Sequence, residues 1–366
     1  MMQLILFAIS AIFLFLGHFF AWFIVISWVS GSPVFIIISV SIILFFFFSI
    51  FLASFLIHRH DNLFTRLYYL LAGVWTGLIV NYLISFCILY TIKFFLPFLF
   101  SNSLLFPGLV VLFTSTLSIY GLYNAFHPRV QEYEVKIKDL SPYWQNKYIV
   151  QISDVHLGPI YRKKSFSRAI DKINKLQPEA VFITGDLFDG MESDFSWLNH
   201  PFSKIKTKQG IYYSFGNHDL YLGFDRVTKL LAESPVMILD NKMKTVEGLQ
   251  LIGINYSFNK NFDLYKAILD QVGYDEKLPS LLLYHEPKNI KLAERAGIDL
   301  QLSGHTHRGQ MFPFSLLAKL VYKGYNHGLF KIGNFTLLVN SGLGTWGPPM
   351  RTAGHSEISR IKLLPL

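Results

Sequence analysis

Long apolar stretches, separated by short polar turns, occupy the first third of the chain. Each stretch holds about 20 or more apolar residues, the length that an α-helix needs to cross the hydrocarbon core of a bilayer. The pattern predicts four transmembrane helices, at about residues 4–28, 34–57, 67–92 and 104–126, with the turn Gly31-Ser32-Pro33 after the first. A cleaved signal peptide is the alternative for the first stretch, which however lacks a basic leading region and a small-residue cleavage site.

The pattern changes after residue 127, where the predicted transmembrane domain (1–127) ends. Residues 128–147 carry mixed charge, and an alternating run at 134–140 is typical of an edge strand, so we expect a linker with one edge strand there. From residue 148 to 366, short apolar runs alternate with amphipathic segments, as in a layered α/β domain. We expect strands at 148–153, 180–184, 211–215, 249–254, 280–284, 299–303 and 335–340. We expect helices at 164–176, 224–232, 264–272 and 288–296.

Charge follows the same division. Up to residue 126 the charged side chains are Arg59, Arg66, Lys93 and Asp61, so +2 of the net charge of +9 lies there and +7 lies beyond. Because Arg59 and Arg66 lie in the second loop, the positive-inside rule favours a cytoplasmic second loop. With an even number of spans, the part of the chain beyond residue 127 would then be cytoplasmic, in an integral protein of the cell membrane. The single cysteine, Cys87, allows no internal disulfide, which agrees with a reducing compartment.

Polar groups are few within the predicted spans. Gly73 and Gly77 form a pair of small residues that would let helices approach closely, and Asn81 would hydrogen-bond across helices. Neither an acidic residue nor a lysine lies at mid-span, so an ion pathway or proton relay is poorly supported. We expect these helices to anchor the chain rather than to transport a solute.

Groups that bind metals or move protons follow five of the predicted strands. The first two of these strands run into Asp154-Val155-His156 and Gly185-Asp186. The others run into Gly216-Asn217-His218-Asp219, His285-Glu286-Pro287 and Gly304-His305-Thr306-His307. Residues two apart in extended backbone point to the same side, so each His-x-His or Asp-x-His pair can face one point. Taken singly, each group has an alternative as a turn residue, a helix cap or a partner of a backbone carbonyl.

Counted as metal ligands, these side chains suit two ions better than one. The candidate ligands are Asp154, His156, Asp186, Asn217, His285, His305 and His307. They are too many for one tetrahedral zinc and suit two octahedral or five-coordinate ions with open positions. Two ions roughly 3.5–4 Å apart clamp an in-line displacement and make hydroxide from bound water near neutral pH. The pattern therefore indicates hydrolysis at phosphorus.

The order of these motifs resembles that of the calcineurin-like metallophosphoesterases. The resemblance covers residues 148–366 and rests on Asp-x-His, Gly-Asp, Gly-Asn-His-Asp, a lone His and Gly-His-x-His. It implies a four-layer α/β (α+β) sandwich, in which two mixed β-sheets are flanked by helices. It also implies two divalent metal ions as cofactors, with Mn²⁺ the first choice and Fe, Zn or Mg as alternatives.

The resemblance implies a role for each site residue as well. The first ion would be held by Asp154, His156 and His307, and both ions would be bridged by Asp186. The second ion would be held by Asn217, His285 and His305. A metal-bridging hydroxide would attack phosphorus. His218 would steady the phosphoryl group or protonate the leaving oxygen, and Asp219 would orient His218.

Finer features are similar to a membrane-anchored subgroup that includes one type of UDP-diacylglucosamine pyrophosphohydrolase. They are residues 299–310, Asn340-Ser341-Gly342-Leu343-Gly344 and Pro349-Met350-Arg351. Two departures leave the substrate open: Arg308 stands where the subgroup usually has glycine, and His355-Ser356-Glu357 stands where it usually has Pro-Glu. Arg308 and Arg351 could offer a planar, charged fork to a phosphate or diphosphate, with a surface salt bridge or a helix-end charge as the alternative for each.

The segment 311–330, which follows the last histidine pair, combines large apolar side chains with Lys319 and Lys323. Two interpretations stay open for it. An amphipathic helix here would dip into the membrane interface and admit a lipid substrate. Alternatively, a short helix here would cover the domain's own core.

Together these features predict a membrane-anchored phosphohydrolase with a dinuclear metal centre. It would cleave a phosphoester or diphosphate bond of a membrane-associated lipid or nucleotide-linked lipid. One alternative is a phosphodiesterase or phosphatase for soluble nucleotides or phosphoproteins, with the helices only a tether. Another is a non-enzymatic regulatory membrane protein, which predicts a lost ligand, whereas the chain has all of them. Its partners would be the bilayer and the phosphate-containing substrate, and nucleic acid is not expected, because there is no dense basic patch with interleaved aromatics.

Overall fold

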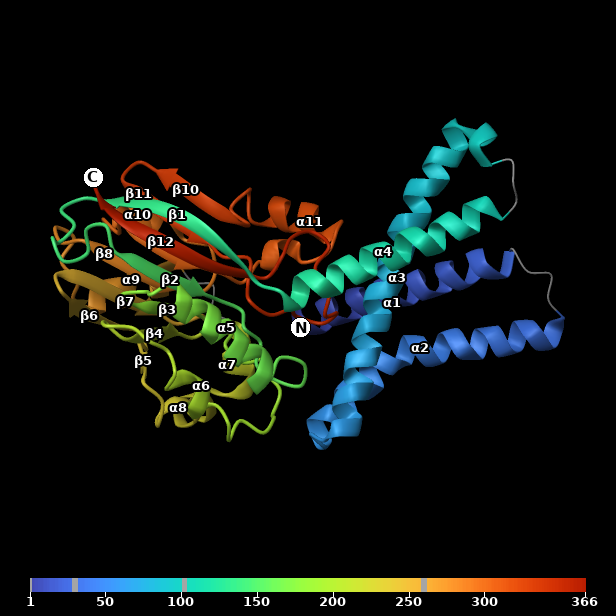
Figure 1. The fold of residues 1–366 in the computed structure, drawn as a ribbon, viewed down its shortest axis with the longest axis horizontal. Helices are drawn as coiled ribbons and strands as arrows, with labels where there is room; N and C mark the ends of the chain where they lie inside the picture. The colour runs from blue at the N-terminus through green and yellow to red at the C-terminus, as the bar shows by residue number, and fades with distance from the viewer. Residues whose placement is uncertain (1, 28–31, 101–103, 258–261) are drawn as a thin grey trace. The chain divides into compact units, whose positions relative to one another are not determined.

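The computed structural model describes residues 2–27, 32–100, 104–257 and 262–366 (Figure 1). Trp28 and Gly31, which belong to the first predicted span and the turn after it, lie outside these ranges. The chain divides into two compact units. Unit 1 comprises Met1–Tyr123 and Gly347–Met350, and unit 2 comprises Asn124–Trp346 and Arg351–Leu366.

Unit 1 is built of long apolar helices. They are α1 (Met2–Ser27), α2 (Pro33–Arg59), α3 (Leu63–Phe95) and α4 (Leu105–Phe126), with the short 3₁₀ helix η1 (Pro97–Phe100) before α4. Ser32 and Asn62 cap the starts of α2 and α3, because their side chains accept backbone amides that have no partner inside the helix. α2, α3 and α4 are long and apolar enough to cross a membrane, and α1 contributes the shorter apolar segment Leu14–Ile24.

The small and polar residues of α3 contact the second segment of unit 1. A Cβ at Gly77 would lie 2.6 Å from the sulfur of Met350, and a Cβ at Gly73 would lie 3.2 Å from Pro349. The two glycines therefore make room for Pro349 and Met350, whereas the sequence pattern had suggested a second helix. Asn81 donates to Ser118 of α4 at 3.0 Å, which is the predicted hydrogen bond across helices.

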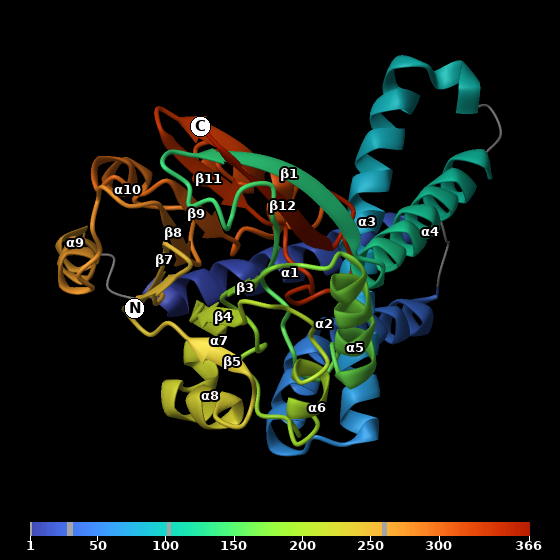
Figure 2. The same cartoon turned by 60° about the vertical axis from the view of Figure 1, so that its left-hand side comes forward.

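Unit 2 contains two six-stranded sheets (Figure 2). In spatial order, the first consists of β1 (Arg129–Ile137), β12 (Glu357–Pro365), β2 (Tyr148–Ile152), β3 (Val181–Thr184), β4 (Ile211–Ser214) and β5 (Val236–Ile238). The second consists of β10 (Gly328–Ile332), β11 (Phe335–Val339), β9 (Leu300–Ser303), β8 (Ser280–Tyr284), β7 (Leu249–Ile254) and β6 (Lys242–Val246). Both sheets are mixed, since β2–β5 run parallel beside an antiparallel β12, and β6 and β10 run antiparallel to their neighbours.

Alternating side chains build a core on each face of the sheets. In β3, Phe182 packs between the two sheets, whereas Val181 and Ile183 face the helical layer. That layer includes α5 (Lys163–Lys175) and α6 (Asn199–Phe202), and α8 (Phe224–Leu231) packs against the same cluster. On the second sheet, α9 (Phe262–Gln271) and α10 (Ile290–Arg295) cover the other outer face. Figure 2 shows α9 and α10 on the opposite side of the sheets from α5 and α6, which confirms the predicted four-layer sandwich.

The sequence pattern missed several strands of this sandwich. β5, β6, β10 and β12 were not predicted, and β1 begins earlier than the alternating run suggested. β5, β6 and β10 carry partly or fully exposed side chains, so their apolar signal is weak. β12 alternates Ile358, Ile361 and Leu363 with charged residues, and it is held in place by partners more than 200 positions earlier in β1. Residues 128–147 therefore contain a full strand of the first sheet.

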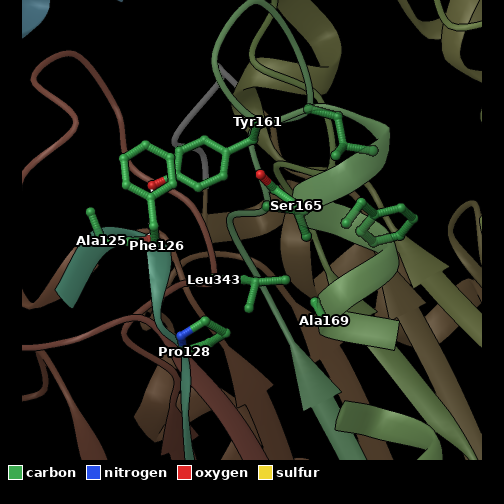
Figure 3. Close-up of a pocket in the computed structure, with 10 residues that line it drawn as sticks. Ala125, Phe126, Pro128, Tyr161, Ser165, Ala169 and Leu343 are labelled. Atoms are coloured by element: carbon green, nitrogen blue, oxygen red, sulfur yellow. Dashed lines mark hydrogen bonds between the residues drawn. The ribbon is translucent and has the colours of Figure 1, made fainter. Parts of the chain in front are cut away.

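The last turn of α4 belongs to unit 2, where it is firmly held. Tyr161 donates to the Ala125 carbonyl at 3.0 Å, and its ring stacks on Phe126 at 5.3 Å. Ser356 donates to the same carbonyl at 2.8 Å. Figure 3 shows the small apolar cavity beside these residues, which also reaches Leu343. Its volume of about 20 Å³ suits a single water and is far too small for a substrate.

Glu357 of β12 is fully buried and links both sheets. Its carboxylate accepts from His327, which precedes β10, at 2.8 Å, and from Tyr133 of β1 at 3.1 Å. Burial alone would raise the pKa of this carboxyl, but the hydrogen bond and charge of His327 lower it to about 2. Since the pKa is lower in the folded state, the carboxylate stabilises the fold above about pH 4.5, and this contribution is lost as the pH falls towards 2.

We expect Glu357→Gln to lower the free energy of unfolding by about 2 kcal/mol at pH 7, since hydrogen bonds to a charged group contribute about that much. Thermal unfolding of the full chain in detergent measures the loss. The gap between variant and parent should narrow as the pH is lowered below 4.5. A gap that does not change with pH would contradict the assigned role of the carboxylate charge. Exposed Glu247→Gln is the matched control.

Candidate metal centre

The five predicted motifs meet at one edge of the sandwich, where β2, β3 and β4 of the first sheet end beside β8 and β9 of the second. Backbone hydrogen bonds fasten these ends together across strands. The Asp154 amide donates to the Gly185 carbonyl at 3.0 Å, and the His156 amide donates to the Asp186 carbonyl at 3.1 Å. The Gly304 amide donates to the His285 carbonyl at 2.8 Å. Carboxyl ends of parallel strands thus place chemistry-bearing side chains on one edge.

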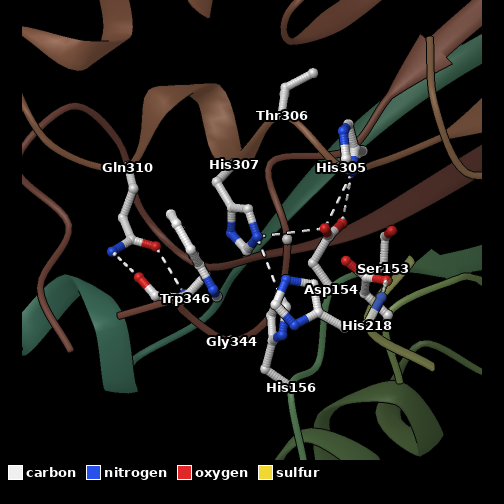
Figure 4. Close-up of polar contacts among 12 residues, drawn as sticks. Ser153, Asp154, His156, His218, His305, Thr306, His307, Gln310, Gly344 and Trp346 are labelled. Carbon is white, nitrogen blue, oxygen red and sulfur yellow. Dashed lines mark hydrogen bonds and ion pairs between the residues drawn. The ribbon is translucent and has the colours of Figure 1, made fainter. Parts of the chain in front are cut away.

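The first donor group combines Asp154, His156 and His307 (Figure 4). Their ligand atoms all lie within 4.8 Å of one another. The Nε2 atoms of His156 and His307 are 3.1 Å apart, and His307 Nε2 lies 3.3 Å from Asp154 Oδ1. Asp154 and His156 are buried. These three are the residues expected for the first ion.

The second donor group combines Asp186, His285 and His305. His285 Nε2 lies 3.1 Å from Asp186 Oδ2 and 3.1 Å from His305 Nδ1. The other nitrogen of His285 faces the Thr184 carbonyl at 2.8 Å, which fixes the ring so that Nε2 points into the group. Asp186, expected to bridge, lies in this second group, and its Oδ1 accepts the His218 amide at 2.8 Å.

Asn217, at the start of α7 (Asn217–Leu222), supplies a further oxygen. Its Oδ1 is buried and has no hydrogen-bond partner among the residues that the structure describes. A buried amide oxygen left unpaired costs about 1–3 kcal/mol. A divalent cation would satisfy it, and imidazole nitrogens with carboxylate and amide oxygens are a donor set that such ions accept. The residues present therefore fit the implied metals, and their chemistry does not select one metal.

Backbone strain accompanies these ligands. Asp154, His156, Asp186, His305 and His307 all have φ between 48° and 69°, the left-handed region that residues with a side chain rarely occupy. Such conformations cost about 1–3 kcal/mol each and persist where the surroundings enforce them, often at functional sites. The turns aim the side chains inward at the expense of local stability.

Glycines allow the strand ends to approach closely. Gly185 has a φ of +80°, and a Cβ there would lie 2.5 Å from His285 Nδ1. A Cβ at Gly304 would lie 2.2 Å from Asp154 Oδ2, too close for any side chain. Gly185 is therefore required by its backbone conformation as well as by space, and Gly304 by space.

Burial and mutual charge shift the titration of the centre. Burial alone would raise the pKa of Asp186, but the charge and hydrogen bond of His285 hold it well below its usual range. Burial disfavours the charged form of His285, yet the Asp186 charge raises its pKa to about 10. Burial, reinforced by His156, holds the pKa of His307 well below its usual value. His307 is thus neutral, the form in which an imidazole binds metal.

His218 lies beside the first group, its ring centroid 4.7 Å from that of His156. Its Nδ1 faces the Asp189 carbonyl at 2.9 Å, so Nε2 is left for a substrate. Burial, followed by the His156 charge, lowers its pKa. The Asp189 carbonyl therefore holds the ring that Asp219 was expected to orient.

Asp219 organises the loops instead. It accepts the backbone amides of Asp186 at 2.7 Å, Gly216 at 2.8 Å and Phe188 at 2.9 Å. Burial, with the Asp186 charge, raises its pKa to about 6. The carboxylate therefore ties the turn after β3 to the turn after β4, and both turns carry ligands.

Sequence reasoning passed over two carboxylates of the centre. Asp189 Oδ1 lies 3.3 Å from His156 Nδ1, and Asp189 forms a third group with His156 and His218. Glu286 Oε1 lies 3.4 Å from His305 Nε2. Asp189 stands three residues after Asp186, and Glu286 stands directly after His285. These positions were the available signals, but an ordinary turn residue looks the same in the sequence.

The two arginines differ in their surroundings. Arg351 is fully buried, and its guanidinium donates to the carbonyls of Gly342, Gly344 and His307 and faces His307 Nδ1 at 3.2 Å. These contacts place it behind a ligand, away from the position expected for a substrate fork. Arg308 has a φ of 53°, and its side chain packs against Gly354 while staying partly exposed.

Aromatic side chains surround the centre. Tyr221 and Trp346 are more than half exposed, and their rings lie 5.2 Å and 6.2 Å from that of His218. Gln310 holds Trp346 by paired hydrogen bonds of 2.9 and 3.0 Å to its backbone (Figure 4). Tyr256 and Tyr322 lie at 6.0 Å and 6.1 Å from the His305 ring. The rim thus offers apolar faces beside a polar interior.

Comparison with known proteins places this site in a family. The family description "Calcineurin-like phosphoesterase" matches residues 147–309. An uncharacterised metallophosphoesterase of Helicobacter pylori is 35% identical over 251 residues, 67% of this chain and 66% of its own length. One of Campylobacter jejuni is 34% identical, covering 68% of this chain and 67% of its own length. This chain spans about two thirds of the length of these relatives.

The name of a vertebrate relative mentions a transmembrane protein as well as the metallophosphoesterase domain. The "Transmembrane protein with metallophosphoesterase domain" of Danio rerio is 33% identical over 274 residues, covering 70% of this chain and 62% of its own length. In this chain, three of the described helices are long and apolar enough to cross a membrane.

We expect Asn217→Ala to weaken binding of one of two metal ions by at least about tenfold, since even partners of metal ligands contribute that much. Titration of the metal-free full chain with Mn²⁺, followed by calorimetry and metal analysis, measures both affinities. Asn174→Ala is the matched control, because Asn174 is partly exposed and its amide nitrogen donates to the Lys204 carbonyl. Two unchanged affinities in Asn217→Ala would exclude Oδ1 as a ligand.

Proposed function

We propose, from the premise that the chain belongs to the calcineurin-like phosphoesterase family, that it is a membrane-anchored, metal-dependent phosphohydrolase. The observation that carries the proposal is the pair of donor groups at one sheet edge, and the buried, unpaired amide oxygen of Asn217 offers a further candidate ligand. This arrangement suits two divalent ions, of which we favour Mn²⁺. The ions would supply Lewis acidity and a water of lowered pKa.

The chain's own residues would hold the ions and move the proton. The first ion would lie among Asp154, His156 and His307, and the second among His285, His305 and Asn217, with Asp186 shared. His218 presents Nε2 to the substrate, because Nδ1 faces the Asp189 carbonyl. That nitrogen would contact a phosphoryl oxygen or give a proton to the leaving oxygen. Arg351 would act as a positioning residue that fixes His307.

We propose a phosphoester or diphosphate of a membrane lipid, or of a nucleotide-linked lipid, as the substrate. Two features support this class: the apolar helices in the same chain and the aromatic rim of the centre. The similarity of residues 299–310 to UDP-diacylglucosamine pyrophosphohydrolases favours a diphosphate. Arg308, partly exposed and one residue from His307, is our candidate for a distal phosphate.

Hydrolysis by purified full chain tests the proposal, with a panel of phospholipids, UDP-linked lipids and soluble nucleotides and with Mn²⁺, Zn²⁺ or Mg²⁺. His218→Ala should lower turnover by about 10²–10⁴-fold, the usual contribution of a proton-transferring group. Asp186→Asn should abolish turnover, and exposed His200→Ala should leave it unchanged. Cleavage confined to soluble esters would make the helices a tether, and lack of cleavage with every metal would support a regulatory role.

We propose further that unit 2 faces the cytoplasm, because Arg59 and Arg66 flank the loop between α2 and α3. In a Cys87→Ser background, a single cysteine at exposed Leu278 should react with a membrane-impermeant maleimide only after the cells are opened. Labelling of intact cells would reverse the orientation.

A further inference from the structure

Helix α11 (Phe314–Val321) buries none of its eight described residues. The exposed fractions of Leu316, Leu317, Leu320 and Val321 are 61%, 56%, 76% and 61%. Single exposed leucines are ordinary on a protein surface, but contiguous ones mark interaction sites. The second interpretation of this segment, a helix that covers the domain's own core, does not match these exposures.

The exposed side chains share one side of the helix. Leu316 and Leu320 are four residues apart, as are Leu317 and Val321, so successive turns stack them into one apolar face. Lys319 and Lys323 are exposed alongside, and lysine stems can lie along an apolar surface while the ammonium reaches water. An apolar face edged by lysines is the pattern of helices that lie in a membrane interface.

The partner that best fits the apolar face of α11 is a lipid bilayer. α2, α3 and α4 are long and apolar enough to span one, and the last turn of α4 already belongs to unit 2. Only two residues separate the end of α4 at Phe126 from the start of β1 at Arg129. Beyond residue 126 the chain carries +7 of its net charge of +9, which suits an anionic leaflet.

The helix is also coupled to the metal centre on both sides. It follows η2 (His307–Gly309), whose first residue is a candidate ligand, and Met311 between them is buried. Tyr322, at its C-terminal end, lies 6.1 Å from the ring of His305. α11 is therefore linked to the candidate ligands at both of its ends.

We propose that α11 lies in the headgroup region of the bilayer spanned by the same chain, with Leu316, Leu317, Leu320 and Val321 among the acyl chains. The centre then opens at the level of the lipid phosphates. The proposed membrane contact is inferred from the exposed apolar face of α11 and does not depend on the proposed function. Its consequence for catalysis, delivery of a lipid phosphate, rests on the proposed function.

Site-directed fluorescence tests the membrane contact without activity. In Cys87→Ser chains reconstituted singly into nanodiscs, an environment-sensitive dye on Leu320→Cys should emit at shorter wavelength than one on Leu278→Cys. Leu278 is a matched control, since it is 47% exposed and precedes β8, at the opposite end from His285. Spin-labelled lipids should quench only the dye at position 320. A water-like emission there, or a shift that lipid labels do not quench, as contact with a second copy would give, overturns the proposal.

A second pair of variants tests the consequence. Leu316→Glu with Leu320→Glu should lower turnover of a lipid substrate in bilayers by about tenfold or more, since each leucine loses its apolar burial. Turnover of a water-soluble phosphodiester should stay at the parent level, and Leu278→Glu should change neither rate. Equal loss on both substrates would mean damage to the centre and would refute the delivery role. If the parent cleaves neither substrate, the proposed function fails while the quenching result still decides the membrane contact.

Discussion

The cost of burying Asp154 and Asp186 governs the rest of the catalytic unit. Both carboxylates are almost fully excluded from water, and two like charges in one buried site would repel each other as well. The surrounding imidazoles offset only part of this, because His305 and His307 have pKa values held well below their usual range and stay neutral. Bound divalent cations would supply the missing positive charge.

The buried carboxylates must be held in place, and many hydrogen bonds fix the loops around them. Five ligand residues occupy left-handed backbone, and such turns would relax if the strands beneath them could move. The two sheets prevent this, since their strand ends are cross-linked by backbone hydrogen bonds and by Asp219, which ties two loops through three amides. Arg351 does the same for the loop at Gly342–Gly344 and for His307. Much of the polar chemistry near the centre thus serves geometry, with only a few groups left to meet a substrate.

The local pattern of apolar and polar residues was enough to predict many of the strands and much of the candidate site. β7 and β8 have the predicted bounds, because strands buried on both faces appear in the sequence as uninterrupted apolar runs. The four-layer sandwich, which the family resemblance implied, is confirmed as well. The structure brings together Asp154, His156 and His307, and likewise Asp186, His285 and His305, since a strand followed by a polar turn fixes where its side chains go. Contacts between segments that are distant in the chain could not be predicted from the sequence. β12 forms by pairing with β1, and Asp189 joins the centre through its contact with His156. The burial of Arg351 depends on carbonyls that come close only after folding. The same holds for Gly73 and Gly77, whose neighbours are Pro349 and Met350.

Selectivity must then come from outside the ligand set. Two ions held by the candidate ligands would recognise phosphoryl oxygens and would be indifferent to what those oxygens carry. What can distinguish a lipid from a nucleotide is the surface around them: Tyr221 and Trp346 beside His218, Arg308 in its strained turn, and the exposed face of α11. Three of these four features follow β9 in the chain, where the sequence also departs from the subgroup that it resembles. In the proposed function, the strand ends would therefore specify the catalytic chemistry, and the segments after the last histidine pair would contribute most to the choice of substrate.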